Sequence, residues 1–313
     1  MTTKMKAIQL NEYGPSSALR YEDVQRPVAG SGQVLVRVAA AGVNPIDWKF
    51  RAGYLKDMIP LALPWTPGFD FSGTVEAVGP DVTGLAVGDA VFGKSAFPGG
   101  GSYAQFVVVT PAEIVRKPAG VDHVHAAAIP AGALTAWQAL FNDGALELAA
   151  GQTLLILGAG GSVGGFAVQL AKRKGARVIA AGRASQQAHL TALGADVFID
   201  TALKNLSLAG QVDAVLDLVG GELQEQAWPQ LKQGGAFVST ISPPSADQAA
   251  TRGARITLVF TQTSAEQLAA VAKLVDQGAV KVQIAKTLPL EKAAEAHALL
   301  EAQGVSGKVV LTT

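Results

Sequence analysis

A glycine-rich turn between an apolar run and a helical pattern constrains the fold of this chain more than any other feature. The apolar residues 154–157 lead directly into the glycines of residues 158–164. Unbroken apolar runs are typical of buried parallel strands, and Phe166, Leu170 and Ala171 follow the turn at helical spacing. The segment therefore predicts a strand, a tight turn and a helix, which is the unit that binds a nucleotide pyrophosphate.

The spacing from Ala159 onward is A-x-G-x-x-G, close to the G-x-G-x-x-G fingerprint of dinucleotide-binding proteins. A side chain at Gly161 or Gly164 would obstruct either the ligand or the packing of the helix. A flexible turn is the alternative interpretation, but the apolar run before it and the helical pattern after it favour a nucleotide site. The residues expected to contact the dinucleotide here are Ala159, Gly160, Gly161, Ser162, Val163 and Gly164.

The next strand, expected at Arg177–Ala181, predicts which dinucleotide is bound. An NAD site places Asp or Glu at the end of this strand, whereas this chain continues with Gly182, Arg183, Ala184 and Ser185. A guanidinium forms charge-assisted hydrogen bonds to a 2′-phosphate, and Ser185 adds a further donor. The loop therefore predicts NADP(H) as the cofactor, with a solvated surface charge as the alternative for Arg183.

The pattern along the chain changes near residue 126 and again near residue 265. Before residue 126, short β-rich segments alternate with Gly and Pro turns, which predicts a small barrel or sandwich with strands at 34–38, 73–78 and 106–109. The middle of the chain predicts a six-stranded, doubly wound parallel sheet. Its strands are expected at residues 153–157, 177–181, 197–200, 214–218, 236–240 and 256–260.

The end of the chain is assigned to the N-terminal domain. A helix near 291–300 and a strand at 308–311 follow a nucleotide sheet that six strands already fill. We therefore expect an α/β protein with one domain formed by residues 1–125 and 265–313. The second domain is the nucleotide-binding domain, formed by residues 126–264.

Composition and charge exclude several classes of function. The 313 residues carry 25 acidic and 25 basic side chains, so the charge balance implies no nucleic-acid partner. The first residues lack an apolar signal core, and Pro130, Gly132 and Gln138 interrupt the apolar stretch 126–141, so we expect no membrane span and a cytoplasmic location. The absence of cysteine excludes disulfides, thiolate metal sites and a cysteine nucleophile.

Seven short motifs, in order along the chain, carry a family resemblance. They are residues 41–47, 67–75, 88–91 and 134–137, the glycine turn, and residues 212–217 and 307–310. From Met5 to Thr313 the chain resembles the zinc-free quinone oxidoreductase branch of the medium-chain dehydrogenase/reductase superfamily. The resemblance implies a GroES-like β-barrel built from both chain ends, a Rossmann domain between them, and NADPH in a cleft with its nicotinamide facing the barrel. It also implies a homodimer formed through the edge of the nucleotide sheet.

The resemblance further implies that no metal ion is bound. Zinc-dependent relatives use a Cys and a Gly-His-Glu segment to hold catalytic zinc, whereas this sequence has Asn44 and residues 68–70, Gly-Phe-Asp. Structural zinc in such relatives needs four thiolates, and this chain has none. We interpret the one H-x-H pair, His123 and His125, as a solvated helix end.

Without zinc as a Lewis acid, hydride delivery to an electron-poor acceptor is the easier chemistry, which favours small-molecule quinones, enones and enals as substrates. Asn44 is expected to hydrogen-bond the acceptor oxygen or a ribose hydroxyl, and Asp47 to order Asn44. Tyr54 is expected to line the pocket and to donate a proton directly or through water. A plain turn is the alternative for Asn44 and Pro45.

Further cofactor contacts are expected outside the glycine turn. In the resembling enzymes Thr135 lies near the nicotinamide, with a helix N-cap or a packed β-branched residue as its alternative role. The ends of the fourth and fifth nucleotide-domain strands contribute Asp217, Val219, Ser239, Ile241 and Ser242. The alternatives to an NADPH-dependent reductase are a redox sensor or structural protein of low turnover, and a zinc-independent alcohol dehydrogenase.

Overall fold

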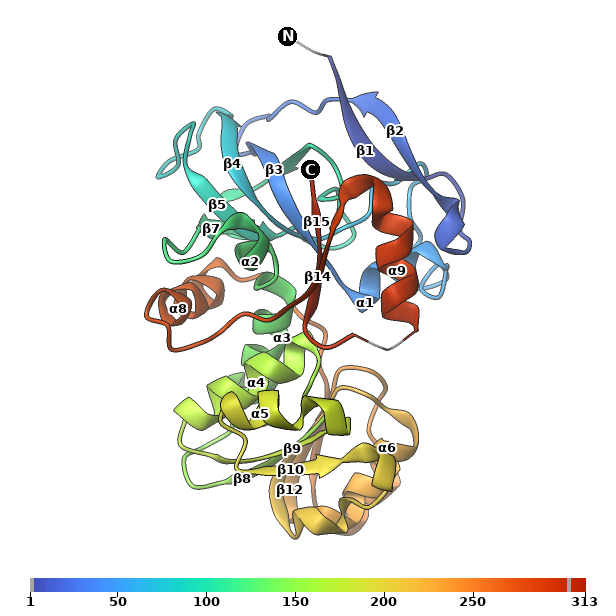
Figure 1. The fold of residues 1–313 in the computed structure, drawn as a ribbon, viewed down its shortest axis with the longest axis vertical. Helices are drawn as coiled ribbons and strands as arrows, with labels where there is room; N and C mark the ends of the chain where they lie inside the picture. Colours follow the sequence, from blue (N-terminus) through green and yellow to red (C-terminus); the bar gives the residue numbers. More distant parts are fainter. Residues whose placement is uncertain (1–2, 303–304) are drawn as a thin grey trace. The chain divides into compact units, whose positions relative to one another are not determined.

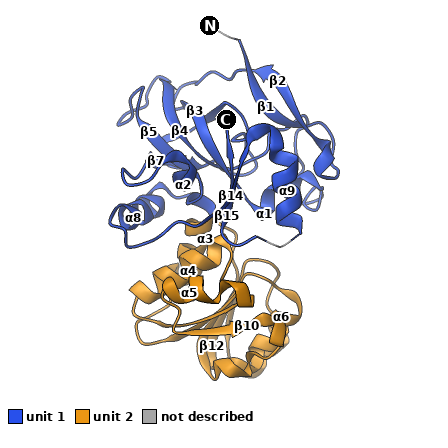
Figure 2. Ribbon diagram, viewed as in Figure 1, with its two compact units in different colours: residues 1–131, 263–313 blue, residues 132–262 orange. Residues whose placement is uncertain are grey.

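Two units make up the computed structural model, which describes residues 3–302 and 305–313 (Figure 1). Unit 1 comprises Met1–Ala131 and Thr263–Thr313, and unit 2 comprises Gly132–Gln262 (Figure 2). Both ends of the chain thus belong to unit 1. Within the described residues, no helix combines the length and apolar character needed to cross a bilayer.

Unit 2 is built on a six-stranded sheet in which every neighbouring pair is parallel, in the order β10-β9-β8-β11-β12-β13. The first strand of the unit lies in the middle, and the strand order reverses beside it, which is the arrangement of a doubly wound nucleotide-binding sheet. The expected fold class is therefore confirmed for this unit. The strands are β8 (Thr153–Leu157), β9 (Arg177–Gly182), β10 (Val197–Asp200), β11 (Val212–Asp217), β12 (Leu231–Ser239) and β13 (Arg255–Leu258).

Helices cover the buried strands of this sheet. Leu154–Leu157 of β8 are fully buried, which explains why this strand reads as an unbroken apolar run. Helix α4 packs on β8 and β9, and α5 packs on β10 (Figure 1). The helices are α3 (Pro130–Phe141), α4 (Ser162–Arg173), α5 (Gln187–Ala192), α6 (Gly221–Ala227) and α7 (Ala246–Arg252), with 3-10 turns η3 (Ala184–Gln186), η4 (Thr201–Leu203), η5 (Leu206–Ala209) and η6 (Trp228–Gln230).

Unit 1 is organised around the long strand β3. One edge of β3 pairs with β4, while the other edge pairs with β6 through Val34–Arg37 and with β15 through Ala40–Val43. The C-terminal strand thus joins the N-terminal sheet, as the sequence predicts. The strands are β3 (Val34–Val43), β4 (Asp70–Val78), β5 (Ala90–Lys94), β6 (Phe106–Val109), β7 (Ile114–Arg116), β14 (Ile284–Pro289) and β15 (Lys308–Thr312), beside the hairpin β1 (Lys4–Leu10) and β2 (Leu19–Gln25).

Short helices complete unit 1. Helix α1 begins two residues after β3, so the end of a buried strand and the start of a helix meet at Asn44. The expected C-terminal helix is present as α9, which packs against α1 (Figure 1). The helices are α1 (Pro45–Arg51), α2 (His123–Ala127), α8 (Ala265–Asp276) and α9 (Ala293–Glu301), with 3-10 turns η1 (Ser16–Ala18), η2 (Pro111–Glu113) and η7 (Leu290–Lys292).

Candidate active site

The glycine turn of unit 2 presents free backbone N–H groups. Gly158 leaves β8 with a φ of +78°, and Gly161 caps α4 in an extended conformation without a side-chain cap. The first hydrogen bond of the helix runs from the Gly165 N–H to the Gly161 carbonyl at 2.9 Å. The N–H groups of Ser162, Val163 and Gly164 therefore have no acceptor within the helix and remain available to a ligand.

Each glycine of the turn has a different reason to lack a side chain. A Cβ on Gly160 would lie 2.1 Å from Gln186, and one on Gly164 would lie 2.4 Å from the Ala159 carbonyl oxygen. A Cβ on Gly161 would meet no protein atom closer than 3.6 Å. Packing therefore requires Gly160 and Gly164, whereas the space at Gly161 is open, and these residues fit the pyrophosphate of a dinucleotide.

Ala159 connects the glycine turn to the neighbouring strand β9. It is fully buried, and its N–H donates to the Ala181 carbonyl of β9 at 3.0 Å. That N–H is consequently not available to a phosphate. Of the six residues expected in the turn, Gly161, Ser162, Val163 and Gly164 are the ones positioned at the open helix start.

The loop after β9 is fixed by a residue that the sequence interpretation missed. Gln186 is buried, accepts a hydrogen bond from the Arg183 N–H at 2.9 Å, and fills the space beside Gly160 and Gly182. Arg183 and Ser185, the expected 2′-phosphate residues, are exposed in this loop. No local sequence signal marks Gln186, because its role depends on one glycine of the turn after β8 and on another at the end of β9.

The ends of β11 and β12 are held together by buried polar groups. Asp217 Oδ1 accepts from the N–H groups of Val219 and Gly220 at 3.0 and 2.8 Å, and Asp217 Oδ2 accepts from the Ser239 hydroxyl at 2.8 Å. The Ser239 hydroxyl in turn accepts from the N–H of Ile241 at 3.1 Å. With every oxygen engaged, Asp217 positions the two loops.

Exposed apolar side chains lie on these loops. Val219 and Ile241 are both exposed, while Ser242 is half-buried and Ser239 fully buried. Val219 packs over Gly158, where a Cβ would lie 2.6 Å from its methyl group. The ends of β8 and β11 are therefore in contact, as the sequence interpretation of the sheet edge requires.

Thr135 is buried on α3, with its hydroxyl 2.6 Å from that of Thr261. One turn later, the Gln138 amide exchanges two hydrogen bonds with the backbone of Gln262, at 2.8 and 2.9 Å. Both side chains tie the segment after β13 to α3. Thr135 lies inside α3, which excludes the N-cap alternative and leaves that of a packed residue.

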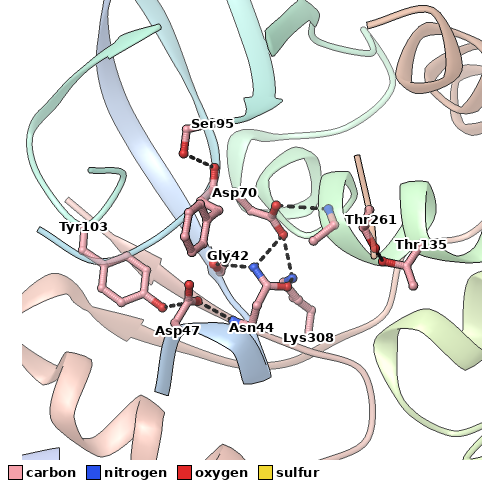
Figure 3. A network of polar contacts seen from close by, with 11 residues as sticks. Gly42, Asn44, Asp47, Asp70, Ser95, Tyr103, Thr135, Thr261 and Lys308 are labelled. Carbon is pink, nitrogen blue, oxygen red and sulfur yellow. Dashed lines mark hydrogen bonds and ion pairs between the residues drawn. The ribbon is translucent and has the colours of Figure 1, made fainter. Parts of the chain in front are cut away.

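In unit 1, Asn44 and Asp47 form a buried cluster with Tyr103 (Figure 3). Asp47 Oδ2 accepts from the Asn44 N–H at 2.7 Å and from the Tyr103 hydroxyl at 2.9 Å. Asp47 Oδ1 is buried and has no hydrogen-bond partner among the residues that the structure describes, and burial raises the pKa of this carboxyl from 3.8 to about 7. Asp47 therefore orders the loop that carries Asn44. Its own carboxyl is mostly protonated at pH values below about 7.

A second part of the cluster joins three strands (Figure 3). The Lys308 ammonium donates to Asp70 Oδ2 at 2.7 Å and to Asn44 Oδ1, and Asn44 Nδ2 donates to Asp70 Oδ2 at 3.0 Å. The remaining Asp70 oxygen accepts from the Ala131 N–H at 3.0 Å. Asp70 and Lys308 lie within motifs of the sequence, but their pairing follows only from the register of β4, β3 and β15.

This donor set does not fit a zinc ion. The oxygens of Asn44 and Asp70 surround the ammonium of Lys308, which supplies the positive charge that these groups require. In residues 3–302 and 305–313, no cluster of three or more His, Asp or Glu side chains has the proximity that a metal site needs.

Three expected residues lie apart from this cluster. Tyr54 is 71% exposed, and its ring packs edge-on against Trp48 at 5.6 Å. His125, which we interpreted as part of a solvated helix end, is half-buried with its side chain 42% exposed, and it pairs with Asp122. His123 differs from that expectation, because it is half-buried and its Nδ1 lies 2.8 Å from the Ser72 hydroxyl.

Comparisons with known proteins agree with this geometry. Residues 30–119 match the family described as alcohol dehydrogenase GroES-like domain, and residues 193–311 match the family described as zinc-binding dehydrogenase. A chloroplast envelope quinone oxidoreductase homolog of Arabidopsis thaliana is 32% identical over 98% of both chains. An NADPH-dependent alkenal/one oxidoreductase of the same plant is 32% identical over 98% of this chain and 79% of its own length.

Solved structures give the same result. The quinone oxidoreductase from Coxiella burnetii superposes with a TM-score of 0.90 at 36% identity, over 99% of both chains. Full-length similarity at this identity, together with the GroES-like match in unit 1 and the parallel sheet of unit 2, confirms the expected fold class. The chain belongs to the quinone oxidoreductase branch of the medium-chain dehydrogenase/reductase superfamily.

Proposed function

We propose that this protein is an NADPH-dependent reductase that delivers hydride to quinones or α,β-unsaturated carbonyl compounds without zinc. The observation that carries the proposal is the buried ion pair of Lys308 and Asp70, which joins Asn44 in place of a metal centre. The relatives named as quinone and alkenal/one oxidoreductases support the substrate class. A lysine held in this way cannot polarise an alcohol as zinc does, so acceptors that are already electron-poor suit the site.

The cofactor would be held by residues of unit 2. The N–H groups of Ser162–Gly164 would bind the pyrophosphate, while Arg183 and Ser185 would bind the 2′-phosphate of NADPH. Val219 and Ile241 would cover its apolar faces, on loops that Asp217 and Ser239 hold in place. The bound dinucleotide supplies a hydride.

Residues of unit 1 would act on the acceptor. The orientation of the Asn44 amide is fixed by Asp70 and Lys308, and its oxygen keeps one lone pair for a ribose hydroxyl. Addition of hydride to the β carbon moves an electron pair onto the acceptor oxygen, and Tyr54 or water then protonates the enolate. Asp47 acts through Asn44 as a positioning residue.

Turnover of NADPH with a panel of acceptors tests the proposal. The panel contains a benzoquinone, a 2-alkenal, an alkenone and the matched saturated aldehyde, and loss of nicotinamide absorbance is followed. We expect reduction of the conjugated compounds and little reduction of the saturated aldehyde. Faster oxidation of a saturated alcohol with NADP+ would indicate an alcohol dehydrogenase, and dinucleotide binding without turnover of any acceptor would indicate a sensor.

A further inference from the structure

Lys94 is a buried cation of unit 1 to which the cluster around Asn44 gives no anionic partner. Lys94 is 3% exposed, and the hydrogen bond that it donates to the Thr263 hydroxyl is long at 3.4 Å. Across the described residues 3–302 and 305–313, no carboxylate lies within ion-pair distance of its ammonium. The ammonium instead contacts two aromatic rings, with the centroid of Phe97 at 4.4 Å and that of Phe69 at 5.7 Å.

The carboxylate of Asp70 lies near Lys94 but is hydrogen-bonded to other groups. Lys94 ends β5 directly opposite Asp70 in the antiparallel ladder with β4, so both side chains lie on the same face. Asp70 Oδ2 is taken by Lys308 and Asn44, and its Oδ1 by the Ala131 N–H. Two lysines therefore lie near one carboxylate, and only Lys308 is paired with it.

The surroundings make the ammonium of Lys94 less stable than it is in water. Desolvation lowers the pKa of Lys94, and the charges of Asp70, Asp47 and Glu113 oppose this effect only in part. A cation–π contact compensates less than the desolvation of a buried ammonium costs, so packing alone would be served better by an apolar residue. Lys94 is a buried cation without a paired anion, and aromatic rings lie beside it. Such a group is a candidate binding site for a ligand that carries negative charge.

We infer that Lys94 is the residue that holds the oxygen of the acceptor while hydride addition turns it into an oxyanion. This assignment rests on the proposed function. With the hydride that a bound dinucleotide would supply, the new C–H bond would form at the β carbon, and the displaced π electron pair would become the enolate or phenolate charge on oxygen. The Lys94 ammonium donates a charge-assisted hydrogen bond to that oxygen and keeps its proton.

The aromatic contacts fit this class of acceptor. Phe97 is partly exposed, whereas Phe69 is buried, so we expect a planar conjugated carbonyl to approach the ammonium from the side of the Phe97 ring. Conjugated acceptors stack on aromatic rings, and a saturated aldehyde gains less from them. The same residues would therefore favour quinones and enones over simple aldehydes.

Binding of 4-nitrophenol, in the presence of NADP+, tests the oxyanion site without any turnover. The wild type should bind the phenolate preferentially, so that the visible phenolate band of the bound probe appears at a pH about one unit lower than in water, a tenfold shift in the ionisation equilibrium. Lys94→Met should abolish this shift. Lys6→Met removes a lysine that lies over the ring of Tyr21 on the surface of the same unit, and it should behave as the wild type. A K94M probe spectrum identical to that of the wild type would overturn the assignment.

Kinetics provide the second test. Lys94→Met should lower kcat/KM for an alkenone by about 100-fold, the effect of removing one oxyanion donor, while the dissociation constant for NADPH changes by less than about twofold. Lys94→Ala should regain activity on addition of ethylamine, which a defect in folding would not do. Unchanged kcat/KM in K94M, with a wild type that reduces the alkenone, would refute the role of Lys94. A wild type that reduces no acceptor would refute the proposed function instead, and the nitrophenol titration would still decide on the oxyanion site.

Discussion

Replacement of Asp47 by Asn should change the pH dependence of the stability of unit 1 in a direction that the structure fixes. Asp47 is fully buried, and burial raises its pKa from 3.8 to about 7. Oδ2 accepts two hydrogen bonds, whereas Oδ1 has none and is free to carry a proton. The native state therefore retains a proton that the unfolded chain releases above about pH 4.

The sign and size of the effect follow from this difference. Because the folded pKa is raised, the stabilising contribution of protonated Asp47 is complete below pH 3.8 and is lost as the pH rises through about 7. A difference of about three pKa units corresponds to roughly 4 kcal/mol. The D47N variant cannot titrate, so its stability relative to the wild type should rise by about that amount between about pH 4 and pH 8.

A second buried group, His297, also changes the stability of the wild type with pH, so the effect of Asp47 must be measured as a difference from D47N. Burial lowers the pKa of His297 from 6.5 to about 3, so its contribution to stability is lost as the pH falls from 6.5 toward 3. Between about pH 4 and pH 6.5 the two groups change the wild-type stability in opposite directions, and their slopes cancel. Only the difference between D47N and the wild type isolates Asp47.

Hydrogen exchange of β3 amides, measured by mass spectrometry, reports opening of unit 1 separately from unit 2. Opening free energies are compared at several pH values for the wild type, D47N and a control, Asp57→Asn, which removes an exposed carboxylate of the same unit. D57N should follow the wild type at every pH. A D47N difference that stays constant with pH would refute the linkage argument.

Three further predictions concern the cofactor and the metal. Gly161→Val should leave the melting temperature unchanged, because the space there is open, yet weaken dinucleotide binding by at least about 100-fold in a fluorescence titration. Gly164→Val should instead lower the melting temperature itself. A dinucleotide affinity in G161V equal to that of the wild type would contradict the placement of the pyrophosphate. Arg183→Ala should raise KM for NADPH roughly ten- to hundredfold and leave KM for NADH nearly unchanged, and equal effects on both would make Arg183 structural. Exhaustive chelation should not reduce activity, and activity that is lost and then restored by zinc would contradict the zinc-free assignment.

Sequence patterns predicted the buried elements of the fold well. Strands β8 and β9 are buried over almost their whole length, so each reads as a nearly continuous apolar run, and the strand β15 is recognisable for the same reason. The strands without a clear prediction are short or half-exposed. For example, β14 is mostly exposed and ends in Pro289, a residue that disfavours a strand assignment.

The candidate site divides in the same way. The glycine turn is visible in the sequence because it is a local backbone requirement at the start of one helix. The contact of Lys308 with Asn44 and Asp70 joins residues far apart in the chain, and only the strand register brings them together. Tyr54 is close to Asn44 in the sequence, but its side chain is exposed and lies outside the buried cluster. Proximity in the sequence therefore did not predict proximity in the site.

The buried groups of unit 1 also carry an unequal charge, and this imbalance links the proposals. Asp70 offsets Lys308, and Asp47 is largely protonated below about pH 7, so the charge of a protonated Lys94 is not balanced within the cluster. Such a site stabilises an acceptor that becomes anionic more than one that stays neutral, which is the differential binding that accelerates a hydride transfer. Ionisation of Asp47 at higher pH would cancel this excess charge. Under the proposal for Lys94, its positive charge is therefore unbalanced, and available in full to an anionic acceptor, only while Asp47 remains neutral.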